Sequence, residues 1–187
     1  MTASRREQYT ESMSTPSSTP KLSPTQIGII GENLLVNAVM KASGGQLSPF
    51  KPVADDDGLD VLFFDKKTGN SVAIQLKCRT TTDRRSKSTK RGNTAQFNVR
   101  IATFNEARRA FLVAALLNEE QTGFECTWFI PMEHLPKVST VKPKTLVITP
   151  SRAKDSDDKY KKYRCETPEE LAKRVVDECK TQPKGKK

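Results

Sequence analysis

Apolar residues recur along the chain with two different periods, and each period predicts a different element. Positions 27–39 carry large apolar side chains at helical spacing. Ser23 and Pro24 precede them and suit an N-cap and a first helical turn. Gly44-Gly45 follows and suits a helix end. The pattern therefore predicts a first helix between these two signals.

Elsewhere, apolar runs and alternating residues are typical of strands. The clearest alternation covers residues 71–79, where apolar side chains alternate with Ala73, Gln75 and Lys77. The preceding segment KKTGN has turn chemistry, so this strand and the one before it predict a hairpin. The predicted strands cover residues 50–54, 59–65, 71–79, 96–101, 110–117, 124–130 and 145–148.

The segment TPEE at residues 167–170 has the pattern of a capping box and predicts a closing amphipathic helix to about Cys179. Residues 132–135 predict a helical turn. A helix, several strands and a second helix indicate an α/β or α+β domain with a central mixed sheet. A chain of 187 residues is long enough for one core, and we expect it to span residues 23–179.

Both ends of the chain lack core-forming side chains. Residues 1–22 are rich in Ser, Thr and Pro and are predicted to be disordered, and residues 180–187 form a basic tail. No stretch approaches the ~20 apolar residues of a membrane span, and the N-terminus has no apolar signal core. We expect an intracellular protein, cytoplasmic or in the nucleoid or nucleus, that is not secreted.

The charge balance favours a polyanionic partner. Lys and Arg number 32 against 22 Asp and Glu, which gives a formal net charge of +10. A basic but otherwise ordinary soluble protein is the alternative that charge alone leaves open. The four cysteines lie far apart without a CxxC pair, so zinc-site spacing is absent and reduced thiols are expected. No GxxxxGK[ST] phosphate loop occurs, which argues against ATP-driven work.

The predicted hairpin brings chemically useful side chains together. Folding it about the turn near Thr68 places Asp60 opposite residues 75–77, within reach of Gln75 and Lys77. Carboxylate and amide oxygens are ligands for Mg²⁺, and a lysine beside them could orient or deprotonate a water or stabilise developing charge. Glu32, on the first helix, could complete a metal shell directly or through water.

These residues resemble the PD-(D/E)xK nuclease superfamily over about residues 24–130. Glu32 lies in GENLL, Asp60 in DDGLD, and Gln75 and Lys77 in QLK, in the order of that family. The resemblance implies a restriction-endonuclease-like core, in which a central mixed sheet is flanked by helices. It also implies an endonuclease that hydrolyses phosphodiester bonds in DNA with Mg²⁺, for which Mn²⁺ can substitute.

Carried over by position, the resemblance makes Glu32 the helix acid, Asp60 the central metal ligand, Gln75 the variable position and Lys77 the lysine of the motif. The chain departs from the commoner pattern because Gln75 replaces an acid, and a neutral ligand weakens metal binding. The alternative is therefore a nuclease-like module that binds nucleic acid without cutting it. Without Asp60 opposite, Lys77 would be better explained as an edge-strand lysine, and Glu32 could equally be a solvated helix residue.

A basic run follows directly after Lys77. We interpret it as a phosphate-contacting flap, with a solvated loop or a localisation signal as alternatives. DNA is the expected partner, RNA is an alternative, and a homodimer is left open. The run consists of Arg79, Arg84, Arg85, Lys87, Lys90 and Arg91.

Overall fold

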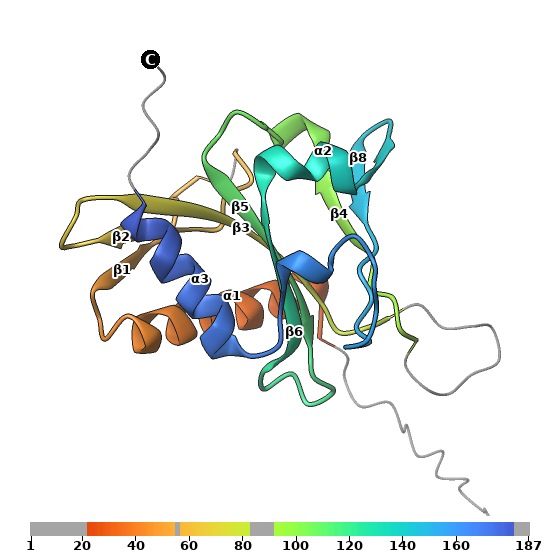
Figure 1. Ribbon diagram of the computed structural model, residues 1–187, viewed down its shortest axis with the longest axis horizontal. Coiled ribbons are helices and arrows are strands. Elements are labelled where there is room, and N and C mark those ends of the chain that lie inside the picture. Colours follow the sequence, from red (N-terminus) through yellow and green to blue (C-terminus); the bar gives the residue numbers. More distant parts are fainter. Residues whose placement is uncertain (1–21, 55–56, 83–91, 182–187) are drawn as a thin grey trace, which may run out of the picture.

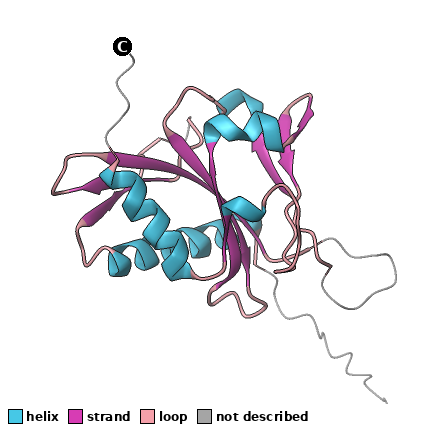
Figure 2. Cartoon of the chain, in the orientation of Figure 1, coloured by secondary structure: helices cyan, strands magenta, loops and turns pink. Residues whose placement is uncertain are grey.

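The computed structural model describes residues 22–54, 57–82 and 92–181, which form a mixed α/β fold around a six-stranded sheet (Figures 1 and 2). Its strands lie in the order β1 (Leu47–Phe50), β2 (Val61–Asp65), β3 (Ser71–Arg79), β5 (Ala110–Leu117), β6 (Phe124–Pro131) and β9 (Arg164–Cys165). β3 and β5 are parallel, and the other neighbours are antiparallel. The predicted central mixed sheet is confirmed.

The two faces of this sheet are covered differently. Two helices, α1 (Pro24–Ala42) and α3 (Pro168–Lys180), pack against each other on one face (Figure 1). They enclose a core that includes Leu35 and Val113. The opposite face packs on α2 (Leu135–Val138) and on a second sheet, in the order β4 (Phe97–Arg100), β8 (Thr145–Ile148) and β7 (Thr140–Lys142).

Helices flank the central sheet less completely than predicted. Both long helices lie on the same face, and the core on the other face is built by strands and the short α2, with Phe97 and Trp128 fully buried in it. Short 3₁₀ turns at Ile101–Thr103, Met132–His134 and Lys161–Tyr163 complete the elements of the described residues. None of the described helices is long and apolar enough to cross a membrane.

The helix starts follow the predicted signals with one correction. At α1, Ser23 Oγ accepts a hydrogen bond from Gln26 N (3.2 Å), and Gln26 Oε1 accepts one from Ser23 N (2.8 Å), which completes a capping box. At α3, Thr167 Oγ1 caps Glu170 N (3.1 Å), but the Glu170 carboxylate accepts from Glu166 N (2.9 Å). The capping box predicted at α3 is therefore only half formed.

The strand predicted at 50–54 begins earlier, as β1 at Leu47, because the chain enters the sheet directly after the Gly44-Gly45 turn. β1 ends at Phe50, two residues before Pro52, which has no N–H to donate to a ladder. β7 and β9 were not predicted. The tail at 1–22, except for Leu22, and residues 182–187 of the basic tail lie outside the described residues.

α1 packs closely on β3 at Gly31, which is buried. A Cβ at this position would overlap Cys78 Sγ and would lie 3.3 Å from Leu76 Cδ2. We expect Gly31→Ala to lower the free energy of unfolding by about 1–2 kcal/mol, because overpacking outweighs the helix propensity that alanine adds. The measurement is urea unfolding followed by circular dichroism.

The matched control is Gly28→Ala in the same helix, where a Cβ would meet no atom within 4 Å. It should gain up to about 1 kcal/mol from helix propensity. Adding Cys78→Ala to Gly31→Ala should restore part of the lost stability, because it removes the overlapping sulfur. Equal stabilities for Gly28→Ala and Gly31→Ala would contradict the close contact between α1 and β3.

Candidate functional site

The turn of the β2–β3 hairpin is closed by Asp65, which is fully buried. Its carboxylate accepts hydrogen bonds from Gln46 Nε2 (2.8 Å), Lys67 N (2.9 Å) and Thr68 Oγ1 (2.8 Å). These hydrogen bonds, that from Gln46 most of all, lower the pKa of Asp65 to about 2. The turn predicted at residues 66–70 is thus held by an ionised side chain with satisfied oxygens.

Closing the hairpin at this turn places Asp60 against β3. Val61 pairs with Ile74, and Asp60 N donates to Ile74 O at 2.9 Å, so Asp60 lies level with Gln75. Asp60 Oδ2 accepts a hydrogen bond from Leu76 N at 2.5 Å. The prediction that Asp60 lies opposite residues 75–77 is confirmed.

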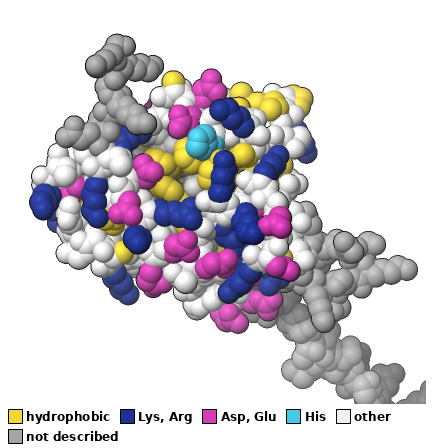
Figure 3. Space-filling view, viewed as in Figure 1, with side chains coloured by type: hydrophobic (Ala, Val, Ile, Leu, Met, Phe, Trp, Pro, Cys, Tyr) yellow, Lys and Arg dark blue, Asp and Glu magenta, His cyan; other side chains and the backbone are white. Residues whose placement is uncertain are grey.

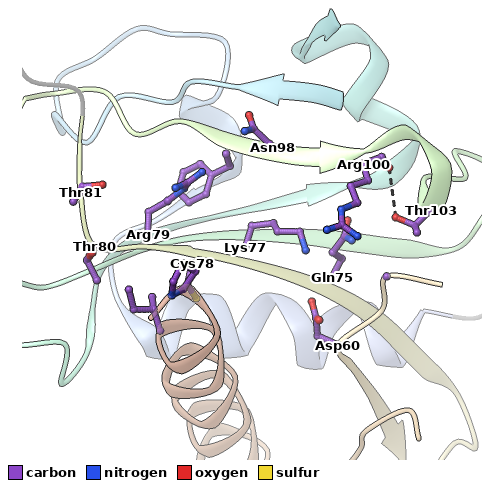
Figure 4. A pocket seen from close by; sticks show the side chains of 14 residues that line it. Asp60, Gln75, Lys77, Cys78, Arg79, Thr80, Thr81, Asn98, Arg100 and Thr103 are labelled. Carbon is purple, nitrogen blue, oxygen red and sulfur yellow. Dashed lines mark hydrogen bonds between the residues drawn. The ribbon is translucent and has the colours of Figure 1, made fainter. Parts of the chain in front are cut away.

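Asp60, Gln75 and Lys77 line one pocket of about 650 Å³ (Figure 4). The β2–β3 hairpin forms one side of it, and Asn98 and Arg100 reach it from β4. The Lys77 side chain extends toward the part of the pocket where Gln75 and Asp60 lie (Figure 4). The structure therefore brings three of the four predicted site residues together.

Gln75 is the most buried polar side chain of the pocket, with 3% of its surface exposed. Among the described residues, none forms a hydrogen bond with its amide. Neither amide atom of Gln75 is buried without a partner, so the amide opens onto the pocket, where water or a ligand can hydrogen-bond with it. The glycine at residue 58 leaves room for the Gln75 side chain, because a Cβ there would lie 2.8 Å from both Gln75 Nε2 and Thr103 Oγ1. Its φ of +66° also favours glycine.

The pocket is predominantly cationic. Lys77, Arg79 and Arg100 line it, and Asp60 is the one carboxylate among its described lining residues. Within the described part of the chain, none of these three cations forms an ion pair. The first turn of α1 also borders the pocket through Pro24, which adds the positive end of the helix dipole. This environment favours an anion such as a phosphate group.

The Cys78 thiol also borders the pocket, but it is not a nucleophile. Burial most of all, together with the nearby carboxylates of Asp60 and Glu32, raises its pKa to about 12. The reactive form of cysteine is the thiolate. Cys78 therefore stays protonated at neutral pH.

Glu32, the fourth predicted site residue, is not among the residues that line the pocket. Its carboxylate accepts a hydrogen bond from Lys51 Nζ at 2.7 Å on the partly exposed side of α1. Its assignment as the helix acid stays a prediction. No group of three or more His, Cys, Asp or Glu in residues 22–54, 57–82 and 92–181 is arranged to hold a metal ion.

The oxygen atoms in the pocket nevertheless suit a hard cation that takes its remaining ligands from a bound substrate. Asp60 offers a carboxylate and Gln75 an amide oxygen in the same pocket. Mg²⁺ commonly binds through one or two carboxylates and completes its shell with waters and phosphate oxygens. The residues therefore fit a Mg²⁺ ion bound together with a phosphate, and do not fit one held by described side chains alone.

The predicted basic flap is only partly described. Arg79, at the exposed end of β3, lines the pocket, and the other five residues of the run lie outside the described residues. Asn98, Arg100 and Thr103 were not predicted as site residues. The alternation of apolar and polar residues in FNVR could have placed Asn98 and Arg100 on one face of a strand, but it does not reveal which surface that face opposes.

The comparisons with known proteins do not identify a family for the chain, so its function is argued from the geometry of the site. A scan against protein-family models and a search of curated proteins both find no match to the chain.

Proposed function

We propose that the chain is a metal-dependent endonuclease that hydrolyses phosphodiester bonds in DNA, with Mg²⁺ as its metal and Mn²⁺ as a substitute. The observation that carries this proposal is the meeting of Asp60, Gln75 and Lys77 in one basic pocket. The resemblance to PD-(D/E)xK nucleases implies the same combination of side chains. A restriction-endonuclease-like core is part of the proposal and is supported by the central mixed sheet.

In this proposal each side chain has a separate task. Arg79 and Arg100 hold the phosphate through charge-assisted hydrogen bonds. Asp60 and Gln75 would hold the Mg²⁺ ion, which would polarise the phosphate and make a water more acidic. Lys77 orients the attacking water and stabilises the negative charge that develops on the phosphoryl oxygens. The water oxygen loses a proton to solvent and bonds to phosphorus, the bond from phosphorus to the leaving sugar oxygen breaks, and that oxygen takes a proton from another water.

The proposal is tested by incubating plasmid and branched DNA with the full chain and Mg²⁺, Mn²⁺ or EDTA. We expect nicked or shortened DNA with either metal, no product in EDTA, and recovery when excess Mg²⁺ is returned. The same assay on RNA tests the alternative substrate. Intact DNA with both metals, or equal cleavage in EDTA, would contradict a metal-dependent nuclease.

A second candidate function is a nuclease-like module that binds nucleic acid without cutting it. The neutral Gln75 and the pairing of Glu32 with Lys51 outside the pocket favour it, because both reduce the negative charge available to a metal. Binding of DNA in a gel-shift assay, without product in either metal, would identify this function. A homodimer and an intracellular location stay predictions.

A further inference from the structure

The pocket has a second wall that the nuclease motif does not include. In β4, buried apolar residues alternate with the exposed Asn98 and Arg100. Both of these side chains line the pocket, across from the β3 residues Gln75 and Lys77 (Figure 4). Gln96 Nε2 donates to Asn98 Oδ1 at 3.2 Å, which restrains the Asn98 amide. β4 therefore presents a polar face with a fixed amide and a cation.

The arrangement of charge points to a phosphate held between two walls. Lys77 comes from the main sheet and Arg100 from the second sheet, and both reach the same pocket. Within the described residues neither has a carboxylate partner, so both are available to an anion. A guanidinium offers several donors in a planar fork that matches phosphate oxygens. The two cations can therefore bind one phosphate from opposite sides.

The size of the pocket limits what can carry that phosphate to the site. Its volume of about 650 Å³ falls within the range of roughly 300–1,000 Å³ that is usual for small-ligand sites. A double helix is far larger, since its major groove alone is about 12 Å wide. Gln75, 3% exposed, lies deep in this pocket. An intact duplex can contact the rim, whereas an unpaired strand can place a nucleotide inside.

We infer, resting on the proposed function, that the pocket takes one nucleotide of an unpaired DNA strand. Its phosphate lies between Lys77 and Arg100, and its base lies against the polar face of β4 at Asn98. The preferred substrate is therefore DNA with a single-stranded segment, such as a branch, a gap or a frayed end. Proteins that bind single strands characteristically follow the nucleic-acid backbone with a positively charged groove.

The test compares binding of a labelled single-stranded oligonucleotide with binding of its duplex, by fluorescence anisotropy in EDTA. We expect the parent protein to bind the single strand about tenfold more tightly. Arg100→Ala should weaken that binding about tenfold and reduce the slope of log affinity against log salt by about 0.7, the contribution of one single-strand phosphate. Arg100→Lys should restore most of the slope, because the charge returns.

The matched control is Lys142→Ala, which removes an exposed cation from β7 of the same sheet, outside the pocket. It should leave affinity and slope unchanged. If the parent binds DNA but prefers the duplex, or if Arg100→Ala behaves like Lys142→Ala, the inference is wrong while the proposed nuclease stands. If the parent binds neither DNA, the inference is wrong, and the proposed function fails with it only if DNA also stays intact with Mg²⁺ and Mn²⁺.

Discussion

Asp60→Asn and Lys77→Ala should each lower the rate of cleavage of bound DNA by roughly 100-fold or more. Asp60→Asn should leave DNA binding intact, and Lys77→Ala should weaken it only about as much as Arg100→Ala does. Asp60 provides the only carboxylate among the described lining residues of the pocket, so its loss removes the strongest metal ligand. Loss of Lys77 leaves the metal ligands but removes the amine that orients the water and stabilises developing charge. Single-turnover cleavage with Mg²⁺ measures the rate, and anisotropy in EDTA measures binding.

The matched control for the carboxylate is Asp57→Asn. Asp57 is exposed and forms an ion pair with Arg108 at 3.1 Å, outside the residues that line the pocket. Its replacement should change cleavage little. If Asp57→Asn and Asp60→Asn lower the rate equally, the carboxylate of Asp60 has no special role in the pocket.

Gln75→Glu provides the opposite contrast within the same site. Returning an acid to this position adds a charged ligand, so cleavage should reach half its maximal rate at a lower Mg²⁺ concentration. The maximal rate should be kept or raised. An unchanged Mg²⁺ dependence would show that Gln75 does not contact the metal.

Arg164→Ala should lower the free energy of unfolding by about 3 kcal/mol. Arg164 is 9% exposed and lies over the ring of Trp128, 5.8 Å from its centroid. Its guanidinium donates to Ser151 O (2.8 Å), Arg152 O (2.8 Å) and Glu166 Oε1 (2.6 Å). Removing it leaves two carbonyls and a carboxylate without these donors, in a partly buried position. Urea unfolding measures the change.

The control for Arg164 is Lys173→Ala on the exposed side of α3, which should change stability by no more than about 0.5 kcal/mol. Both variants lose one positive charge, so their difference isolates the hydrogen bonds and packing of Arg164. A loss below about 1 kcal/mol for Arg164→Ala would mean that these contacts contribute little net stability.

The hairpin and its chemistry could be predicted because their signals are local. The KKTGN turn and the alternation of residues 71–79 fix which residues of the two strands face each other. Asp60 therefore had to lie near Gln75 and Lys77, whatever the rest of the chain did. The same holds for the start of α1, where Ser23 and Pro24 act within a single turn.

The second wall of the pocket could not be predicted, because it depends on contacts between distant segments. β4 pairs with β8, which lies far along the chain. The alternation of residues in β4 shows that Asn98 and Arg100 share one face of the strand, but it does not show which residues that face opposes. Glu32 illustrates the same limit. The sequence placed it on the first helix, but the rotation of α1 on the sheet and the position of Lys51 decide its partner. β9 was too short to give any alternation.

The central claim is that Asp60 and Lys77 act together on one phosphate, and the most direct test is the single-turnover cleavage rate of the double variant. We expect Asp60→Asn with Lys77→Ala to cut DNA no more slowly than the slower single variant, because either change alone disables the same site. Cleavage by the double variant at the parent rate, with contaminating nuclease excluded, would contradict the proposed site. Losses that multiply would show that the two residues act independently.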